Sequence, residues 1–262
     1  MSILLEHLKA NQRRGSKPRC HLLTHGSRDT VAQRLTALVA PFGSVAPTDF
    51  WMPLGFEQTD EAELHKATQL LREEHCAQIR NWWFAIFRGG LQTGPSFDIA
   101  STCVIEGRPG IILVEAKAHD KELKKEEGEK PIQKAASEGE KTNHKRIGEA
   151  IQAANAPFRT STGFNWALSR DSRYQMSNRF ASACKLTELG YPVILVYLGF
   201  LKATEMADQG TPIETAAQWD AAVKAHSQTL FPAEVWNRQW ELHQRPFVPL
   251  IRSKEWPLEA ED

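Results

Sequence analysis

The chain has 262 residues, 41% of them hydrophobic, so it can bury a substantial core, and a fibrous or wholly disordered protein is excluded. Its 32 Lys and Arg balance its 32 Asp and Glu, so no overall field attracts a nucleic acid or a membrane. Any site for a polyanion must therefore be a local patch.

The cysteines and the N-terminal residues indicate the compartment. The four cysteines are far apart and form no C-x-x-C pair, which argues against a zinc ribbon and favours reduced thiols. Charges come too early in MSILLEHLKANQRR for a secretory signal, and no apolar run is long enough to span a bilayer. We expect a cytoplasmic protein without membrane association.

The first half of the chain is predicted to change from helices to strands. Apolar residues at helical spacing predict a helix over 27–39 and a longer one over 59–80. The aromatic run WWFAIFR predicts a buried strand within 81–89. Two further strands are predicted over 96–105 and 110–117, with EGRP between them as a four-residue loop.

A charged segment interrupts this pattern. Residues 119–145 mix both charges with glycine and proline and predict a mobile insertion that orders on substrate. A short helix is expected over 146–154 and a longer one over 174–190, where Gly190 is the stop. The continuous apolar run over 192–202 predicts a strand buried on both faces, and the tail from 211 predicts one more helix around WDAAVKAH.

The order helix, three strands, helix, strand is typical of the mixed α/β class. We expect a single domain over residues 1–262 with a core at about 59–202. An N-terminal helical extension (1–58) and a C-terminal helical and Trp-rich extension (203–262) would flank this core.

Charged residues stand at both ends of the predicted hairpin. Because side chains alternate along a strand, Glu115 and Lys117 share one face. If the EGRP loop pairs Ile105 with Gly110, Asp98 falls opposite Lys117 and diagonal to Glu115, on that same face. Three charges are therefore predicted to converge at one end of the hairpin.

Two carboxylates among apolar neighbours repel each other unless a cation neutralises them. Hard oxygen ligands favour Mg²⁺ or Mn²⁺, which Asp98, Glu115 and the backbone carbonyl of Ala116 would bind. Lys117 would then orient or deprotonate a water and stabilise negative charge on a phosphate. These are the groups that phosphodiester hydrolysis requires.

An S-F-D at the start of one strand and an E-A-K at the end of the next resemble the PD-(D/E)XK nuclease superfamily. That group includes restriction endonucleases, RecB-like exonucleases and Holliday-junction resolvases. The resemblance covers about 59–202 and implies a restriction-endonuclease-like αβββαβ core, a mixed central sheet flanked by helices. It further implies that Asp98 and Glu115 are metal ligands and Lys117 the catalytic lysine. The family's PD is here FD, with Pro95 three residues before the aspartate.

Two further family features match in part. Some members carry a glutamate on the first helix; Glu63 lies at about the expected distance, but it equally suits a capping box opened by Asp60. RecB-like members carry Q-x-x-x-Y, whereas Gln175 is followed four residues later by Arg179. Gln175, Asn178 and Arg179 share a helix face near its N-terminal end and are candidates for substrate binding.

Several charged features are expected to be ordinary surface. These are the basic run over 13–19, the loop residues His119 and Asp120, and a second E-x-K triplet, Glu122 to Lys124. That second triplet shows that the pattern alone is weak evidence for a nuclease.

The function expected from these residues is an Mg²⁺- or Mn²⁺-dependent nuclease that cuts DNA in restriction, repair or mobile-element processing; internal cutting is favoured, and cutting from ends stays open. RNA as substrate and a homodimer both stay open. Two alternatives remain: a structural ion pair at a sheet edge, and a catalytically inactive nuclease-fold protein that serves as a nucleic-acid-binding or scaffolding module.

Overall fold

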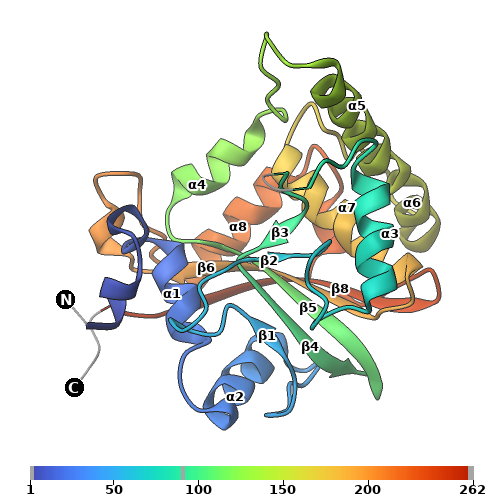
Figure 1. Ribbon diagram of the computed structural model, residues 1–262. Helices are drawn as coiled ribbons and strands as arrows, with labels where there is room; N and C mark the ends of the chain where they lie inside the picture. The colour runs from blue at the N-terminus through green and yellow to red at the C-terminus, as the bar shows by residue number, and fades with distance from the viewer. Residues whose placement is uncertain (1–2, 90–91, 259–262) are drawn as a thin grey trace.

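Figure 1 shows a computed structural model of the chain, which describes residues 3–89 and 92–258. The α-helices are α1 Ser16–Leu23, α2 Arg28–Val39, α3 Glu73–Trp83, α4 Asp120–Lys124, α5 Glu138–Ala153, α6 Asn155–Thr162, α7 Tyr174–Glu188 and α8 Ala216–Ser227. The strands are β1 Trp51–Met52, β2 Ala62–Glu63, β3 Ser96–Phe97, β4 Ile99–Ile105, β5 Arg108–Lys117, β6 Val193–Leu201, β7 Trp240–Leu242 and β8 Arg245–Glu255. Short 3-10 helices lie at Ile3–His7, Ala10–Gln12, Lys125–Glu127, Thr204–Met206 and Ala233–Val235.

A six-stranded mixed sheet forms the centre of the molecule, in the order β1-β4-β5-β6-β8-β7. Strands β5, β6 and β8 run parallel to one another, whereas β1, β4 and β7 pair antiparallel with their neighbours. A second, two-stranded ribbon pairs β2 with β3 and leads directly into β4. The predicted mixed α/β class is confirmed at this level.

Helices cover both faces of the sheet (Figure 1). Helices α3, α5, α6, α7 and α8 pack on the face that carries Leu113 and Tyr197. Helices α1 and α2 pack on the opposite face, against Ile112 and Ile194. Because alternate residues of β6 and of the central part of β5, residues 111–114, are buried against different helices, these stretches are continuously apolar or nearly so.

Several predicted elements are confirmed. The helix over 27–39 is α2, and Ser27 is its N-cap. The helix over 174–190 is α7, which ends as Gly190 adopts a positive φ of 96°. The run over 192–202 is β6, buried on both faces, and the tail helix is α8.

The predicted helix over 59–80 is confirmed only from Glu73 onwards, and the predicted strand over 81–89 is wrong. Helix α3 begins at Glu73, where two glutamates suit the positive end of its dipole, and it continues through Trp83. Cys76, Ile79 and Trp83 recur at helical spacing and are buried together, so this periodicity overrides the strand preference of the aromatic residues. Residues 84–89 do not form a strand.

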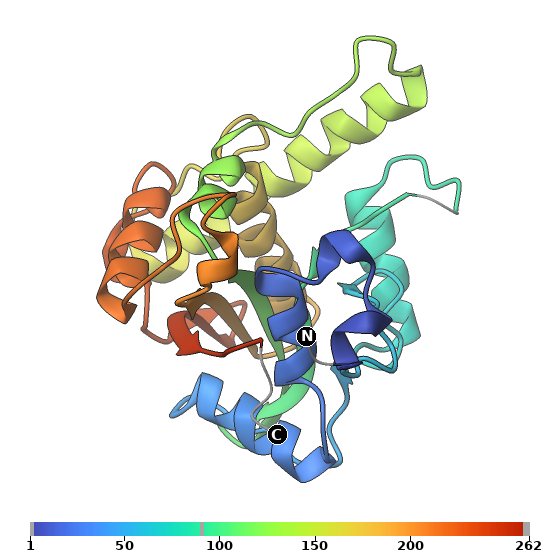
Figure 2. The same ribbon diagram turned by 90° about the vertical axis from the view of Figure 1, so that its left-hand side faces the viewer.

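The helix predicted over 146–154 begins earlier. Helix α5 starts at Glu138, where Ser137 and Glu140 form a capping box. Residues 138–145 of the predicted mobile insertion therefore belong to a helix, which projects away from the sheet in Figure 2. Mobility of the rest of the insertion stays a prediction.

The hairpin between β4 and β5 also differs from expectation. Ile105 pairs with Arg108, so Glu106 and Gly107 form a two-residue turn, with φ values of 49° and 72°. The register therefore shifts by two residues from the one that a four-residue loop predicts. A shift of two leaves every side chain on its predicted face but changes which residues lie opposite each other.

The C-terminal segment contributes more than the predicted helical and Trp-rich extension. It supplies β7 and β8, and nine residue pairs join β8 to β6. Across residues 3–89 and 92–258, no helix combines the length and apolarity needed to cross a bilayer.

Candidate active site

Asp98 and Glu115 meet at the end of the β4–β5 hairpin. The β4–β5 pairing begins at Ile99 and Val114, so the predicted register, which placed Asp98 opposite Lys117, is wrong by two residues. Asp98 lies in the bend just before β4, and its Oδ2 accepts a hydrogen bond at 2.7 Å from the N–H of Ala116, the residue after Glu115. The two carboxylates are therefore close enough for the charge of Glu115 to act on Asp98, while their position on one face of the sheet stays a prediction.

Glu115 is the centre of a polar cluster within the core. It is 2% exposed, and Lys117 Nζ contacts its Oε1. Gln175 Nε2 donates to the same oxygen at 2.9 Å, and Arg179 Nε donates to Oε2 at 2.5 Å. Two of the three residues predicted to bind substrate on α7 therefore bind Glu115.

Asn178, the third residue of that set, is placed differently. It is buried, and its Oδ1 accepts a hydrogen bond from Ser182 Oγ at 3.1 Å, within α7. The helix face that reaches Glu115 is defined by the four-residue spacing of Gln175 and Arg179. A role for Asn178 in substrate binding stays a prediction.

The two carboxylates have opposite pKa shifts. Burial and the charge of Glu115 raise the pKa of Asp98 to about 7, and Lys117 and the Ala116 N–H offset only part of this effect. Burial also acts to raise the pKa of Glu115, but the charges of Arg179 and Lys117 outweigh it, so this pKa lies below its usual value. One carboxylate therefore stays ionised while the other titrates near neutrality.

The residues predicted as metal ligands, Asp98, Glu115 and Ala116, lie next to one another, but only two of them carry carboxylates. Ala116 donates its backbone N–H to Asp98 Oδ2 at 2.7 Å, while metal binding by its carbonyl stays a prediction. Among the described residues, no group of three or more His, Cys, Asp and Glu is close enough to hold a metal. The chemistry of the set still fits a hard cation, because two facing carboxylates with water can bind Mg²⁺.

Glu63 does not lie on a helix and caps none. It lies in β2 opposite Ser96, where its carboxylate pairs with Lys66 at 3.1 Å. The capping box with Asp60 is therefore wrong, because residues 62–63 pair with β3 instead of starting a helix.

Glu61 is the acidic residue that the sequence interpretation missed. It directly precedes Ala62, which pairs with Phe97, the residue before Asp98. Its charge adds a smaller effect to the raised pKa of Asp98, after burial and Glu115. The residues D-E-A-E were interpreted with the period of a helix. The two-residue period of a strand would have separated Glu61 and Glu63 from Ala62, which is buried on the other face.

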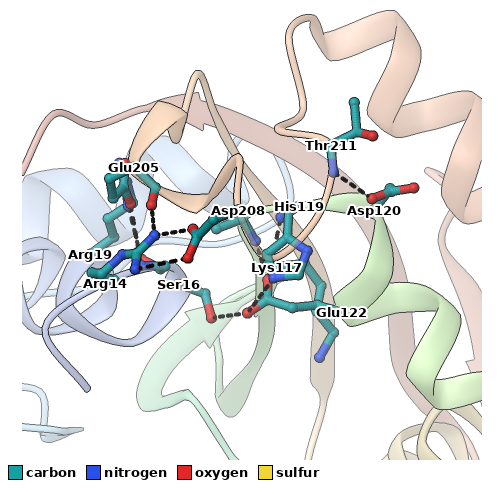
Figure 3. A network of polar contacts seen from close by, with 12 residues as sticks. Arg14, Ser16, Arg19, Lys117, His119, Asp120, Glu122, Glu205, Asp208 and Thr211 are labelled. Carbon is teal, nitrogen blue, oxygen red and sulfur yellow. Dashed lines mark hydrogen bonds and ion pairs between the residues drawn. The ribbon is translucent and has the colours of Figure 1, made fainter. Parts of the chain in front are cut away.

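The N-terminal basic run is partly buried rather than ordinary surface (Figure 3). Arg19 Nη1 lies 2.5 Å from Glu205 Oε1, and Arg14 pairs with Asp208. On the same side of the molecule, Ser16 Oγ donates to Glu122 Oε1 at 3.5 Å. These contacts attach the N-terminal segment to the rest of the chain.

The residues just after Lys117 are also more ordered than predicted. His119 is buried, which contradicts a solvated loop residue. Asp120 is the first residue of α4, and its Oδ1 accepts from the Thr211 N–H at 2.8 Å. In the second E-x-K triplet, Lys124 is mainly exposed and pairs with Asp120, as expected for a surface residue.

Comparisons of the chain with protein-family models, curated proteins and solved structures return no significant match. The chemistry of the cluster around Glu115 therefore carries any functional assignment.

Proposed function

We propose that the chain is a metal-dependent nuclease that hydrolyses phosphodiester bonds of DNA, with internal cutting favoured, on a core like that of the PD-(D/E)XK superfamily. One observation carries the proposal: Asp98 is bound to the N–H next to Glu115, and Lys117 contacts Glu115. A carboxylate pair beside a lysine is the set of groups that this hydrolysis needs.

The electrostatics of the pair support a divalent cation. Burial and the charge of Glu115 raise the pKa of Asp98 to about 7, so ionisation of Asp98 is unfavourable in the metal-free protein. A cation between the two carboxylates would favour the ionised form. Mg²⁺ or Mn²⁺ held by Asp98 and Glu115 would supply Lewis-acid polarisation of a phosphate oxygen. Glu115 would have to exchange at least one of its contacts with Lys117, Gln175 and Arg179.

The chain's own residues would bind and orient the phosphate. Lys117 and Arg179 bring two cations to one carboxylate, so a group released from Glu115 can donate to a phosphate oxygen instead. In hydrolysis a water oxygen forms the new P–O bond, and its proton passes to a base. The P–O ester bond breaks, and the leaving oxygen takes up a proton. Lys117, which lies beside the two carboxylates, would orient or deprotonate that water, while Asp98 and Glu115 hold the metal.

One observation favours the alternative of an inactive binding or scaffolding module. Both oxygens of Glu115 already have cationic or amide partners within the chain, as in a buried structural ion pair. Under this alternative the cluster would stabilise the contact between β5 and α7 and bind no metal.

A cleavage assay with matched variants separates the two functions. Wild type is incubated with plasmid, linear and single-stranded DNA and with RNA, each with Mg²⁺ or Mn²⁺ and with EDTA. We expect metal-dependent cleavage that Asp98→Asn, Glu115→Gln and Lys117→Met each reduce by at least about a hundredfold. Lys124→Met is the control, because it removes the lysine of the surface triplet. Absence of cleavage of every substrate by wild type would favour the binding module.

A further inference from the structure

A pocket of about 470 Å³ opens beside the proposed catalytic aspartate. Its walls come from β1, from the segment that contains β2, and from β3, three elements that lie close together in Figure 1. The residues that matter here are Phe50, Met52, Asp60, Glu61, Glu63 and Ser96.

The pocket lies next to Asp98, because it is lined by Ser96, two residues before Asp98, and by Glu61, whose charge acts on Asp98. Ala62 and Phe97 point into the core, so their neighbours Glu61, Glu63 and Ser96 project from the other face of the ribbon. The Cα atoms of Ser96 and Asp98 are at most about 7 Å apart. The pocket is therefore within reach of a ligand that extends away from Asp98.

The charges of the pocket select its occupant. Lys17 holds Glu61 at 3.0 Å, and Lys66 holds Glu63 at 3.1 Å, so both carboxylates are fixed in position. Ionised carboxylates accept hydrogen bonds and repel phosphates. Lys66 also lines the pocket and balances the charge of Glu63, so the pocket suits a neutral group that can donate hydrogen bonds to the carboxylates.

The apolar part of the wall suits a flat ring. Phe50 and Met52, both partly buried, provide an aromatic ring and a polarisable thioether. A nucleobase combines the two required properties, because its faces stack on such side chains and its edge can carry an amino group. A lysine or arginine side chain of a peptide would satisfy the carboxylates but would not need the flat apolar wall.

We propose that this pocket receives an unpaired nucleobase that carries an exocyclic amino group, from the strand whose phosphate lies at Asp98 and Glu115. This inference rests on the proposed nuclease function and specifies its substrate as single-stranded or flipped nucleotides. Cytosine, adenine and guanine present amino donors to Glu61 or Glu63. Thymine and uracil present carbonyl oxygens on either side of a single N–H, so the carboxylates disfavour them.

Binding is measured without cleavage, by fluorescence anisotropy in EDTA with labelled 12-mers of dC or dT. We expect wild type to bind the dC oligomer about tenfold more tightly than the dT oligomer. Glu63→Gln should reduce this ratio to about twofold, because an amide no longer attracts amino groups alone. Glu57→Gln, which alters an exposed glutamate outside the pocket, should leave the ratio unchanged. Phe50→Leu should weaken binding of both oligomers about equally, because it removes stacking.

The outcomes separate this inference from the proposed function. Equal binding of dC and dT by wild type, or a ratio that Glu63→Gln does not change, overturns the base pocket even if the protein cleaves DNA. Displacement of dC by an arginine-rich peptide whose own binding depends on Glu63 also overturns it. If wild type cuts no nucleic acid but discriminates dC from dT through Glu63, the nuclease proposal fails and the base pocket stands.

Discussion

At the scale of single residues, the opposite pKa shifts of Asp98 and Glu115 follow from an unequal distribution of cations. Arg179 and Lys117 both bind Glu115, whereas the contact at Asp98 Oδ2 is a backbone N–H. Two carboxylates whose environments separate their pKa values are a frequent feature of sites that transfer protons. A purely structural ion pair has no need of the second carboxylate.

Asp98→Asn should stabilise the metal-free protein near neutral pH. The pKa of Asp98 is raised by burial to about 7 in the folded state, so its contribution to stability is full below the unfolded value of 3.8 and is lost as pH rises through 7. Asparagine keeps an acceptor for the Ala116 N–H but carries no charge. In EDTA at pH 8 we expect the free energy of unfolding to rise by about 2 kcal/mol, and the gain should vanish towards pH 4.

Urea denaturation from pH 4 to pH 8 measures this difference. Other groups also titrate in this pH range; burial, for example, lowers the pKa of His226 to about 4. Their effects are the same in both proteins, so the difference in free energy of unfolding between Asp98→Asn and wild type isolates Asp98. Glu57→Gln serves as the control for loss of an exposed carboxylate. A gain in stability that is the same at pH 4 and pH 8 would contradict the assignment of a titrating Asp98.

At the scale of elements, the β4–β5 turn sets the alignment of the cluster. The alternation of side chains along β5 predicted the shared face of Glu115 and Lys117, which contact each other, because that face depends only on parity within one strand. The residues that lie opposite each other depend on the length of the turn, and the sequence EGRP is compatible with either a two-residue or a four-residue turn. Glu106 occupies a position with positive φ that asparagine or glycine usually takes, so the turn was hard to recognise.

Gly107→Ala should lower the free energy of unfolding by about 1 kcal/mol. An added Cβ meets nothing within 4 Å, so the cost comes only from the positive φ of 72°. Gly128 is a matched control, because its Cβ would also meet nothing but its φ is −72°. Gly128→Ala should change stability by less than about 0.5 kcal/mol. Equal thermal shifts for the two variants would argue against the two-residue turn.

At the scale of the whole molecule, local patterns predicted the centre of the sheet better than its borders. Strand β6 is continuously apolar and was recognised, whereas β8 contains Pro246 and Pro249 and was predicted as part of a helical and Trp-rich extension. Strand β7 pairs with residues 245–247 of β8. Pro249 lies beyond these residues, so its missing N–H removes no hydrogen bond between β7 and β8. Such a placement depends on tertiary structure and leaves no signal in the sequence around the proline.

The N-terminal basic run shows the same dependence on distant partners. Arg19 is 2% exposed, and its guanidinium also donates to the backbone oxygens of Trp256 and Gly15, at 2.8 and 2.9 Å. Its pairing with Glu205 joins α1 to the C-terminal half of the chain (Figure 3). Helix α1 in turn carries Lys17, which pairs with Glu61 beside Asp98.

Arg19→Met should therefore destabilise the protein by about 3 kcal/mol, because it leaves a partly buried carboxylate and two carbonyls without their donor. Arg14→Met is the matched control: Arg14 is 46% exposed, so loss of its solvent-screened pair with Asp208 should cost much less stability than loss of Arg19. Thermal denaturation gives the two stabilities, and limited proteolysis should release the N-terminal segment faster in Arg19→Met alone. Equal losses in both variants would mean that α1 is attached by its apolar contacts rather than by Arg19. A large loss of stability in Arg19→Met alone would mean that Arg19 holds α1 in place. The same helix carries Lys17, so Arg19 would then also keep Lys17 beside Glu61.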